Sequence, residues 1–188
     1  CQFAVLASAY ATAGFGIKDP QVGLLNNGTE EHKGDPLHQQ TYQLLKKMDV
    51  INFMGNIEGR DIMLSDCDVA VADGFSGNVA LKAMEGCGKL ILSVLKKEAT
   101  STLSSKIGSL FLMKGFKRMR SKLDFEAVGG ALLLGVKKVV IKSHGSSKAR
   151  TITAAIENAA TIYEGNLIGR VEEMLAKVDW NNLIPDEE

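Results

Sequence analysis

The sequence lacks several features that would assign a chemistry at once. Its 188 residues balance 22 Lys and Arg against 22 Asp and Glu, so charge alone gives no reason to expect a nucleic-acid partner. The only histidines are His32, His38 and His144, and none has zinc-ligand spacing with a cysteine or another histidine. No serine lies in a G-x-S-x-G elbow. We therefore expect no metal, no cofactor and no serine nucleophile.

Cysteines and long apolar runs are also scarce. Cys1, Cys67 and Cys87 are an odd, unclustered set, which suits reduced, buried, structural thiols in a cytoplasmic protein. No uninterrupted apolar run approaches about 20 residues, so we expect no membrane-spanning helix. The chain has no initiator Met, and its first residues already follow a helical rhythm. We expect the chain to be a fragment whose amino-terminal portion is missing.

Apolar runs alternate with helical patterns along the chain. The expected strands are residues 22–25, 50–54, 69–72 and 139–141, and the expected helices include 3–15, 36–48 and a segment ending near 163. This alternation predicts an α/β fold, with a mainly parallel sheet and flanking helices. Loops that follow parallel strands share one edge of the sheet, where ligands bind. The strand-end loops should therefore gather in one cleft.

The most informative of these loops follows the third expected strand. Residues 69–78, VAVADGFSGN, predict a strand, a glycine-rich turn and then a helix, an arrangement that directs backbone N–H groups at an anion such as phosphate. The same pattern is also an ordinary chain reversal. Asn78, where the turn enters the helix, is either an N-cap or a donor to an oxyanion.

Two other strand-end loops carry candidate catalytic groups. Lys33 lies in the loop NNGTEEHKG and either binds phosphate, polarises a carbonyl oxygen or forms a surface ion pair. His144 lies in a Ser- and Gly-rich turn and is a candidate for ligand contact or proton transfer. Glu58 and Arg60 are expected to orient neighbouring loops by ion pairing, with a purely structural role equally open.

The remaining polar and glycine positions of these loops complete the expected phosphate and substrate site. They are Gly28, Glu30, Gly34, Asp73, Gly74, Ser76, Gly77, Lys142, Ser143, Gly145, Ser146 and Ser147.

Residues 99–122 interrupt the alternation with a basic, amphipathic helical segment, either one helix or a helix pair. Its apolar positions are Leu103, Ile107, Leu110 and Phe111, and lysines and arginines lie between and after them. Packing against a core or a dimer partner is one interpretation. Insertion at an anionic membrane surface is the other.

Five motifs together resemble the PlsX family, the bacterial phosphate acyltransferases of phospholipid synthesis. They are GTEEHKG at 28–34, GNIEGRD at 55–61, DGFSGNVALK at 73–82, GGALLLG at 129–135 and VIKSHGSS at 140–147. The chain departs from the family at Leu132, where a proline is usual, and at Lys137 and Lys138, where a glycine-containing turn is more common.

The resemblance implies transfer of a long fatty acyl group from acyl carrier protein to inorganic phosphate, giving acyl phosphate. It also implies a fold like isocitrate and isopropylmalate dehydrogenases and phosphotransacetylases, a homodimer, and peripheral association with the inner face of the cell membrane. Residues 1–188 are then expected to be the carboxyl-terminal portion of one α/β enzyme. Lys33, Asn78 and His144 become the expected catalytic residues. The segment 99–122 becomes the expected membrane contact, and its basic residues could instead dock the acidic carrier protein.

Three rival functions stay open. A phosphotransacetylase would use short acyl-coenzyme A donors. A metal- and NAD-dependent dehydrogenase could share the fold, but its metal aspartates and a G-x-G-x-x-G turn are absent from the sequence. The third is a non-catalytic module that binds a membrane or another protein through residues 99–122.

Overall fold

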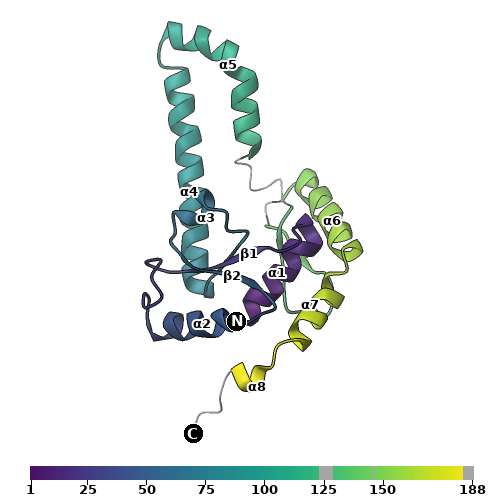
Figure 1. The fold of residues 1–188 in the computed structure, drawn as a ribbon. Coiled ribbons are helices and arrows are strands. Elements are labelled where there is room, and N and C mark those ends of the chain that lie inside the picture. Colours follow the sequence, from purple (N-terminus) through teal and green to yellow (C-terminus); the bar gives the residue numbers. More distant parts are fainter. Residues whose placement is uncertain (123–128, 146, 184–188) are drawn as a thin grey trace.

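A three-stranded parallel sheet forms the centre of the protein. The computed structural model describes residues 1–122, 129–145 and 147–183 (Figure 1). Strand β1 (Gln21–Leu25) lies between β2 (Asn52–Ile57) and β3 (Val69–Val71), and both pairings are parallel. The expected α/β fold with a parallel sheet and flanking helices is confirmed at this level.

Strand β2 contains an irregularity that matters for the site. Val22 pairs with Phe53 but Gly23 pairs with Gly55, so Met54 is an extra residue on β2. Gly55 has φ +102°, a backbone conformation that favours glycine. Such a bulge shifts the alternation of side chains, and beyond it the consecutive residues Asn56 and Ile57 are both buried.

The expected bounds of this strand, 50–54, were therefore wrong. The motif GNIEGRD was expected to be a loop, but its first three residues belong to β2. Glycine and asparagine are poor strand formers, and the sequence pattern gives no sign that a neighbouring strand pairs with them.

The main core lies between the sheet and two helices. Helix α1 (Gln2–Phe15) contributes Ala4 and Val5, and α2 (Pro36–Lys46) contributes Leu45. These side chains pack with Val22 and Val71 of the sheet in one buried cluster. Short helix α3 (Asp61–Leu64) connects β2 to β3.

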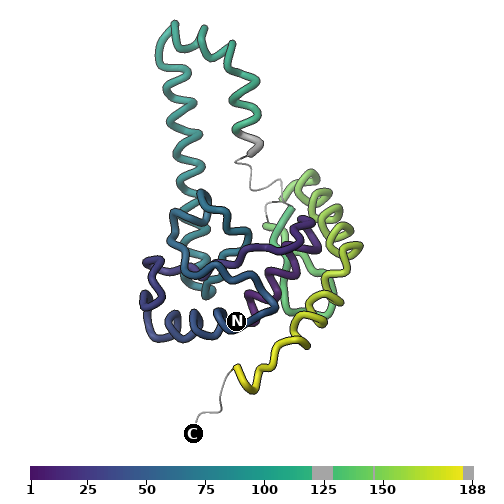
Figure 2. Tube along the Cα trace, in the orientation of Figure 1, coloured from purple at the N-terminus to yellow at the C-terminus, as the bar shows by residue number. Residues whose placement is uncertain are grey.

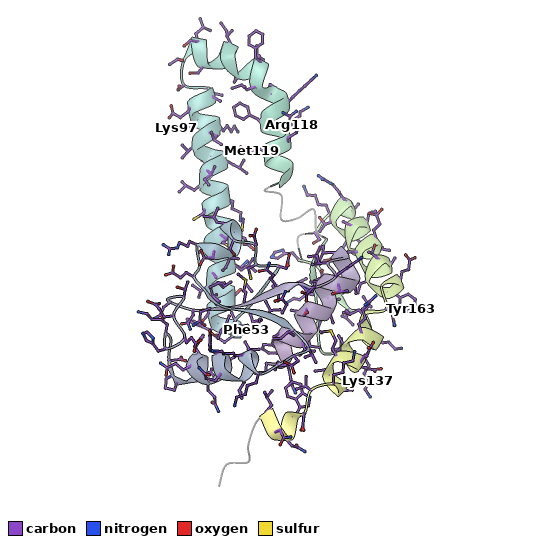
Figure 3. The ribbon with its side chains drawn as sticks, viewed as in Figure 1. Phe53, Lys97, Arg118, Met119, Lys137 and Tyr163 are labelled. Atoms are coloured by element: carbon purple, nitrogen blue, oxygen red, sulfur yellow. The ribbon has the colours of Figure 1, made fainter. Side chains whose placement is uncertain are left out.

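Two long helices project from this body as a hairpin (Figure 2). They are α4 (Gly74–Ala99) and α5 (Leu103–Lys122), so the segment 99–122 is one arm of a helix pair. Figure 3 shows Lys97 and Arg118 on the two arms, far from Phe53 in the sheet. None of the described helices combines the length and apolar character needed to cross a bilayer.

The fourth expected strand does not join the parallel sheet. Strand β5 (Ile141–Lys142) pairs antiparallel with β4 (Ala131–Leu132) in a separate two-stranded sheet. The expectation that Lys142 to Ser147 follow a strand of the main sheet was therefore wrong. Periodicity identifies a strand but does not identify its partner.

Helices of the carboxyl-terminal part pack against α1. They are α6 (Ala149–Glu164) and α7 (Leu167–Ala176), and the short helix α8 (Trp180–Leu183) follows them. Ile162 and Leu167 form a second buried cluster with Ala9 and Ala13 of α1. Leu183 is buried in the main core, so α8 is in part a packing element.

Candidate active site

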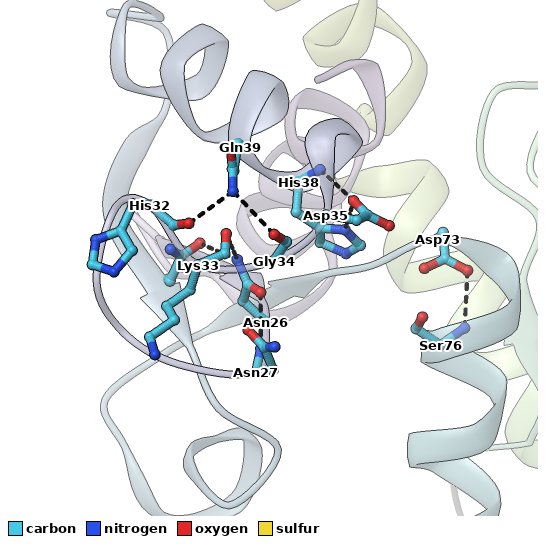
Figure 4. A network of polar contacts seen from close by, with 11 residues as sticks. Asn26, Asn27, His32, Lys33, Gly34, Asp35, His38, Gln39, Asp73 and Ser76 are labelled. Atoms are coloured by element: carbon cyan, nitrogen blue, oxygen red, sulfur yellow. Dashed lines mark hydrogen bonds and ion pairs between the residues drawn. The ribbon is translucent and has the colours of Figure 1, made fainter.

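The loop after β1 is fixed by backbone and side-chain hydrogen bonds (Figure 4). The Asn26 N–H donates to the Ile57 carbonyl at 2.8 Å, and Asn26 Nδ2 donates to the Lys33 carbonyl at 3.0 Å. The Asn27 N–H donates to Asn26 Oδ1 at 2.8 Å. Asn26 thus ties the start of the loop to its end, as asparagine commonly does in turns.

Glycines allow this loop to close tightly. Gly34 has φ +89°, and a Cβ there would lie 2.7 Å from Asn26 Oδ1 and 2.7 Å from the Cβ of His38. Gly28 is buried, and a Cβ there would lie 2.8 Å from Cγ of Lys33 and 2.9 Å from Oε2 of Glu30. Both positions therefore lack space for a side chain.

Lys33 lies on this loop with its side chain half-buried. Glu31 forms an ion pair with Lys46 at 2.7 Å and does not pair with Lys33. Within the described part of the chain, the Lys33 ammonium makes no hydrogen bond or ion pair. A cation on a rigid loop at the carboxyl end of β1 is thus available to an anion.

Helix α2 begins directly after the loop. Asp35 is its N-cap and accepts from the His38 N–H at 2.9 Å, while His38 Nδ1 lies 2.7 Å from Asp35 Oδ1. These contacts hold the pKa of Asp35 below its usual value. Gln39 donates through Nε2 to the carbonyls of His32 and Gly34 at 2.8 and 3.1 Å. The helix end therefore supports the loop from the side opposite Asn26.

The segment after β3 is a capped helix start rather than the expected glycine-rich turn. Asp73 is the N-cap of α4 and accepts from the N–H groups of Phe75 and Ser76 at 2.8 and 2.9 Å, so Gly74, Ser76 and Gly77 form the first helical turn. Hydrogen bonds from Ser76, then from Phe75, hold the pKa of Asp73 at about 2, and the charge of His38 adds to the effect.

This cap reduces the number of backbone N–H groups that can bind a ligand. The Asp73 carboxylate occupies the N–H groups of Phe75 and Ser76 that an anion would otherwise use. Asn78 is not an N-cap but lies inside α4, where its side chain is exposed. Its side-chain amide therefore does not cap the helix and is exposed to solvent.

The loop at 142–147 lies on a different element. Ser143 Oγ donates to the Gly129 carbonyl at 2.7 Å, and the Ser147 N–H donates to the His144 carbonyl at 2.9 Å. Lys142, His144 and Gly145 are exposed, and Ser146 lies outside the described residues. The serine hydroxyl thus stabilises the approach of this loop to the preceding glycines.

His144 lies near enough to α4 for its charge to contribute, after the larger contributions of Lys82 and Lys89, to lowering the pKa of Glu85. At about 1.5 Å of rise per residue, Glu85 lies about 16 Å along the helix from Gly74. Figure 4 also shows the Lys33 side chain extending away from Asp73 and Ser76. The expected residues therefore form separate groups in this chain rather than one cluster.

Glu58 and Arg60 form an ion pair beyond the end of β2. The Glu58 N–H donates to Asp61 Oδ2 at 2.9 Å, and Arg60 Nε lies 3.9 Å from Asp61 Oδ1. The three residues form a local turn at the start of α3.

Other chemistry is limited in the described residues. They contain no group of three or more His, Cys, Asp or Glu side chains able to hold a metal ion. Cys1 and Cys67 are partly buried but Cys87 is exposed, so the expectation of three buried thiols was wrong for Cys87. Burial raises the pKa of the Cys67 thiol.

Two cavities lie away from these loops. One of about 300 Å³ lies between residues 47–50 and 177–183, and another of about 320 Å³ lies beside α1, α7 and residues 132–138. Neither is lined by Lys33, Asn78 or His144.

Comparison with known proteins gives the family. The family model described as "Fatty acid synthesis protein" matches residues 1–170. The chain belongs to this family. The resemblance stated from the five motifs is thereby confirmed.

Several members of the family are named phosphate acyltransferase. The one from Streptococcus uberis is 45% identical over 182 residues, which cover 96% of this chain and 54% of that protein. Those from Helicobacter hepaticus and Thermoanaerobacter pseudethanolicus are 48% and 45% identical, covering 93% and 92% of this chain and 52% of each relative. The chain spans about half the length of the curated relatives it matches.

Sequence reasoning missed the residues that hold the Lys33 loop in place. Asn26, Asn56 and Gln39 make most of its side-chain hydrogen bonds. The signal for Asn26 was present, because asparagine directly after a strand commonly hydrogen-bonds its own turn. Asn56 gave no signal, since its burial depends on the bulge at Met54.

Proposed function

We propose that the protein carrying this sequence transfers a long fatty acyl group from acyl carrier protein to inorganic phosphate. The observation that carries the proposal is the Lys33 ammonium, which has no hydrogen-bond or ion-pair partner among the described residues. It lies on a loop held rigid by asparagine hydrogen bonds at the carboxyl end of β1. The names of the family's members, phosphate acyltransferase, support the reaction class.

In the proposed reaction a phosphate oxygen attacks the thioester carbonyl carbon of the acyl donor. A carbon–oxygen bond forms, the carbon–sulfur bond breaks, and the carrier leaves as a thiolate that takes up a proton. Lys33 binds the phosphate, and the exposed amide of Asn78 donates to the tetrahedral oxyanion. Such a donor is worth about 3 kcal/mol in the transition state.

The loop containing His144 has a secondary part in this proposal. His144 either contacts the phosphate or protonates the leaving thiolate, because an imidazole ring can both donate a hydrogen bond and transfer a proton. Further hydrogen-bond donors come from its neighbours in sequence, which are Lys142, Ser143, Gly145, Ser146 and Ser147. This role requires His144 and Lys33 to come together around the bound substrates.

Several properties of the whole protein are part of the same proposal. They are a fold like isocitrate and isopropylmalate dehydrogenases and phosphotransacetylases, a homodimer, and a cytoplasmic location with peripheral attachment to the inner face of the membrane. The parallel sheet with helices on its faces is consistent with that fold class.

The test of the catalytic assignment is phosphate-dependent formation of acyl phosphate from a long-chain acyl carrier protein. Lys33→Ala should raise the KM for phosphate, whereas Asn78→Ala should lower kcat by about 10²- to 10³-fold. Lys18→Ala is a matched control, because Lys18 is an exposed lysine near the opposite end of β1. Activity of both Lys33→Ala and Asn78→Ala near that of the control would contradict the assignment.

We also propose that α5 contacts the membrane, where the apolar product, a long-chain acyl phosphate, would be released. Leu103, Leu110 and Phe111 are 76%, 69% and 85% exposed, and Ile107 is 53% exposed. Lys106 and Lys114 are exposed on the same helix and would attract anionic headgroups.

Vesicle flotation tests this contact. Leu110→Asp and Phe111→Asp should abolish flotation with phosphatidylglycerol vesicles, because each places a charge in the apolar layer. Leu64→Asp is the control, since Leu64 is 83% exposed on α3, outside the hairpin. Unchanged flotation of the α5 variants would refute membrane contact. Salt-sensitive binding of acyl carrier protein without lipid would then favour a protein-docking role.

A further inference from the structure

The buried amide of Asn56 connects two strand-end loops. Its Nδ2 donates to the Glu30 carbonyl at 2.8 Å, and its Oδ1 accepts from Asn26 Nδ2 at 3.2 Å. Asn56 is only 6% exposed, one of two buried polar side chains in the described core. Burying an amide costs free energy unless both its N–H and its oxygen make hydrogen bonds, and in Asn56 both do.

We propose that Asn56 is a positioning residue for phosphate binding, which acts by fixing the loop that carries Lys33. The inference rests on the proposed function, because Lys33 is its phosphate-binding residue. It concerns a side chain that does not touch the substrate.

The geometry of the loop supports this role. Asn26 Nδ2 donates both to the Lys33 carbonyl and to Asn56 Oδ1, so a single amide connects Asn56 to the backbone of Lys33. On the other side, the Lys33 N–H donates to the Glu30 carbonyl at 3.1 Å, which is the carbonyl that Asn56 Nδ2 also contacts. Asn56 is therefore connected to the Lys33 carbonyl through Asn26 and to the Lys33 N–H through Glu30.

The bulge in β2 explains why Asn56 reaches the loop. The extra residue Met54 and the positive φ of Gly55 shift the side-chain alternation at the end of the strand. Asn56 then pairs with Leu24 in the sheet and its side chain is buried under the loop that begins at Asn26. A strand irregularity thus positions a side chain beside the site, as bulges commonly do.

Loss of this amide should loosen the loop without removing any group that contacts substrate. Asn56→Ala removes two hydrogen bonds and leaves the Glu30 carbonyl and the Asn26 amide without that partner. The KM for phosphate should rise by about tenfold, which corresponds to the loss of one to two ordinary hydrogen bonds. The KM for the acyl donor and kcat should change less than twofold.

The experiment measures both KM values and kcat for the wild type, Asn56→Ala and Asn52→Ala. Asn52 is a matched control on the same strand, since its exposed amide donates to Asp19 Oδ2 at 2.8 Å, away from the loop. Hydrogen exchange at residues 27–33 gives a second readout, and exchange there should accelerate in Asn56→Ala but not in Asn52→Ala.

Asn56→Asp keeps the side-chain volume should Asn56→Ala fail to fold. It retains the acceptor for Asn26 but places an oxygen against the Glu30 carbonyl, so its KM for phosphate should rise as well. An unchanged KM for phosphate, or an equal change in both KM values, would overturn the inference. If Lys33→Ala raises the KM for phosphate while the Asn56 variants do not, this inference alone fails. If Lys33→Ala leaves the KM for phosphate unchanged, both this inference and the proposed function are contradicted.

Discussion

Gly34→Ala is the sharpest structural prediction for the loop that carries Lys33. Gly34 has φ +89°, so an alanine there would be strained by about 1–2 kcal/mol. Its Cβ would also lie 2.7 Å from Asn26 Oδ1 and 2.7 Å from the Cβ of His38. Overpacking of this kind costs about 1–3 kcal/mol, so the total loss in unfolding free energy should be about 2–5 kcal/mol.

Two glycine controls separate these contributions. Gly16, at the end of α1, has φ +72° with nothing within 4 Å of the added Cβ, so Gly16→Ala should cost only the backbone strain of about 1–2 kcal/mol. Gly59 has neither a positive φ nor a neighbour within 4 Å, so Gly59→Ala should change stability by less than about 0.5 kcal/mol.

Urea denaturation of the three variants, followed by far-UV circular dichroism, measures these differences as shifts in the midpoint at constant slope. Gly34→Ala should also accelerate hydrogen exchange at residues 26–34, because the displaced Asn26 amide no longer ties the ends of the loop. A cost for Gly34→Ala no greater than that for Gly16→Ala would refute the close packing of Asn26 against Gly34.

Three further predictions concern the core and the helix start. Leu45→Ala should lower the unfolding free energy by about 2–5 kcal/mol in urea denaturation, because Leu45 is fully buried; a loss below about 1 kcal/mol would contradict its central packing. Gly165→Ala should cost at least about 1–3 kcal/mol in the same assay, since a Cβ would lie 2.3 Å from the Ala13 carbonyl oxygen; a neutral result would refute this helix contact. The Asp73 carboxylate, with a pKa of about 2 against an ordinary 3.8, should stabilise the fold fully above pH 4 and lose that contribution as pH falls towards 2; a carboxyl NMR titration midpoint near 3.8 would contradict this.

The parallel sheet could be predicted from the sequence because its strands are short apolar runs bounded by polar turns. Val22 and Leu24 are buried in the central strand, and residues 69–71 form a strand close to the expected range. Helix α2 begins at residue 36 as expected, since the capping by Asp35 and the proline at the first helical position are local in sequence.

The errors occurred where long-range pairing or competition between caps decides the structure. Asp73 and Asn78 are both residue types that cap helices well, and the structure uses Asp73, so Gly74 and Gly77 lie in the first helical turn. The strand at 141–142 was expected in the main sheet, but its partner is the strand at 131–132. Burial of Asn56 depends on pairing across a bulge, which no local pattern shows.

Product analysis with labelled inorganic phosphate tests the central claim most directly. The protein that carries this sequence should convert label into an acyl phosphate when given long-chain acyl carrier protein, far faster than with acetyl-coenzyme A, and Lys33→Ala should abolish incorporation at low phosphate. Faster incorporation with acetyl-coenzyme A would identify a short-chain phosphotransacetylase instead. No labelled acyl phosphate from either donor would contradict the proposal that this protein transfers acyl groups to phosphate.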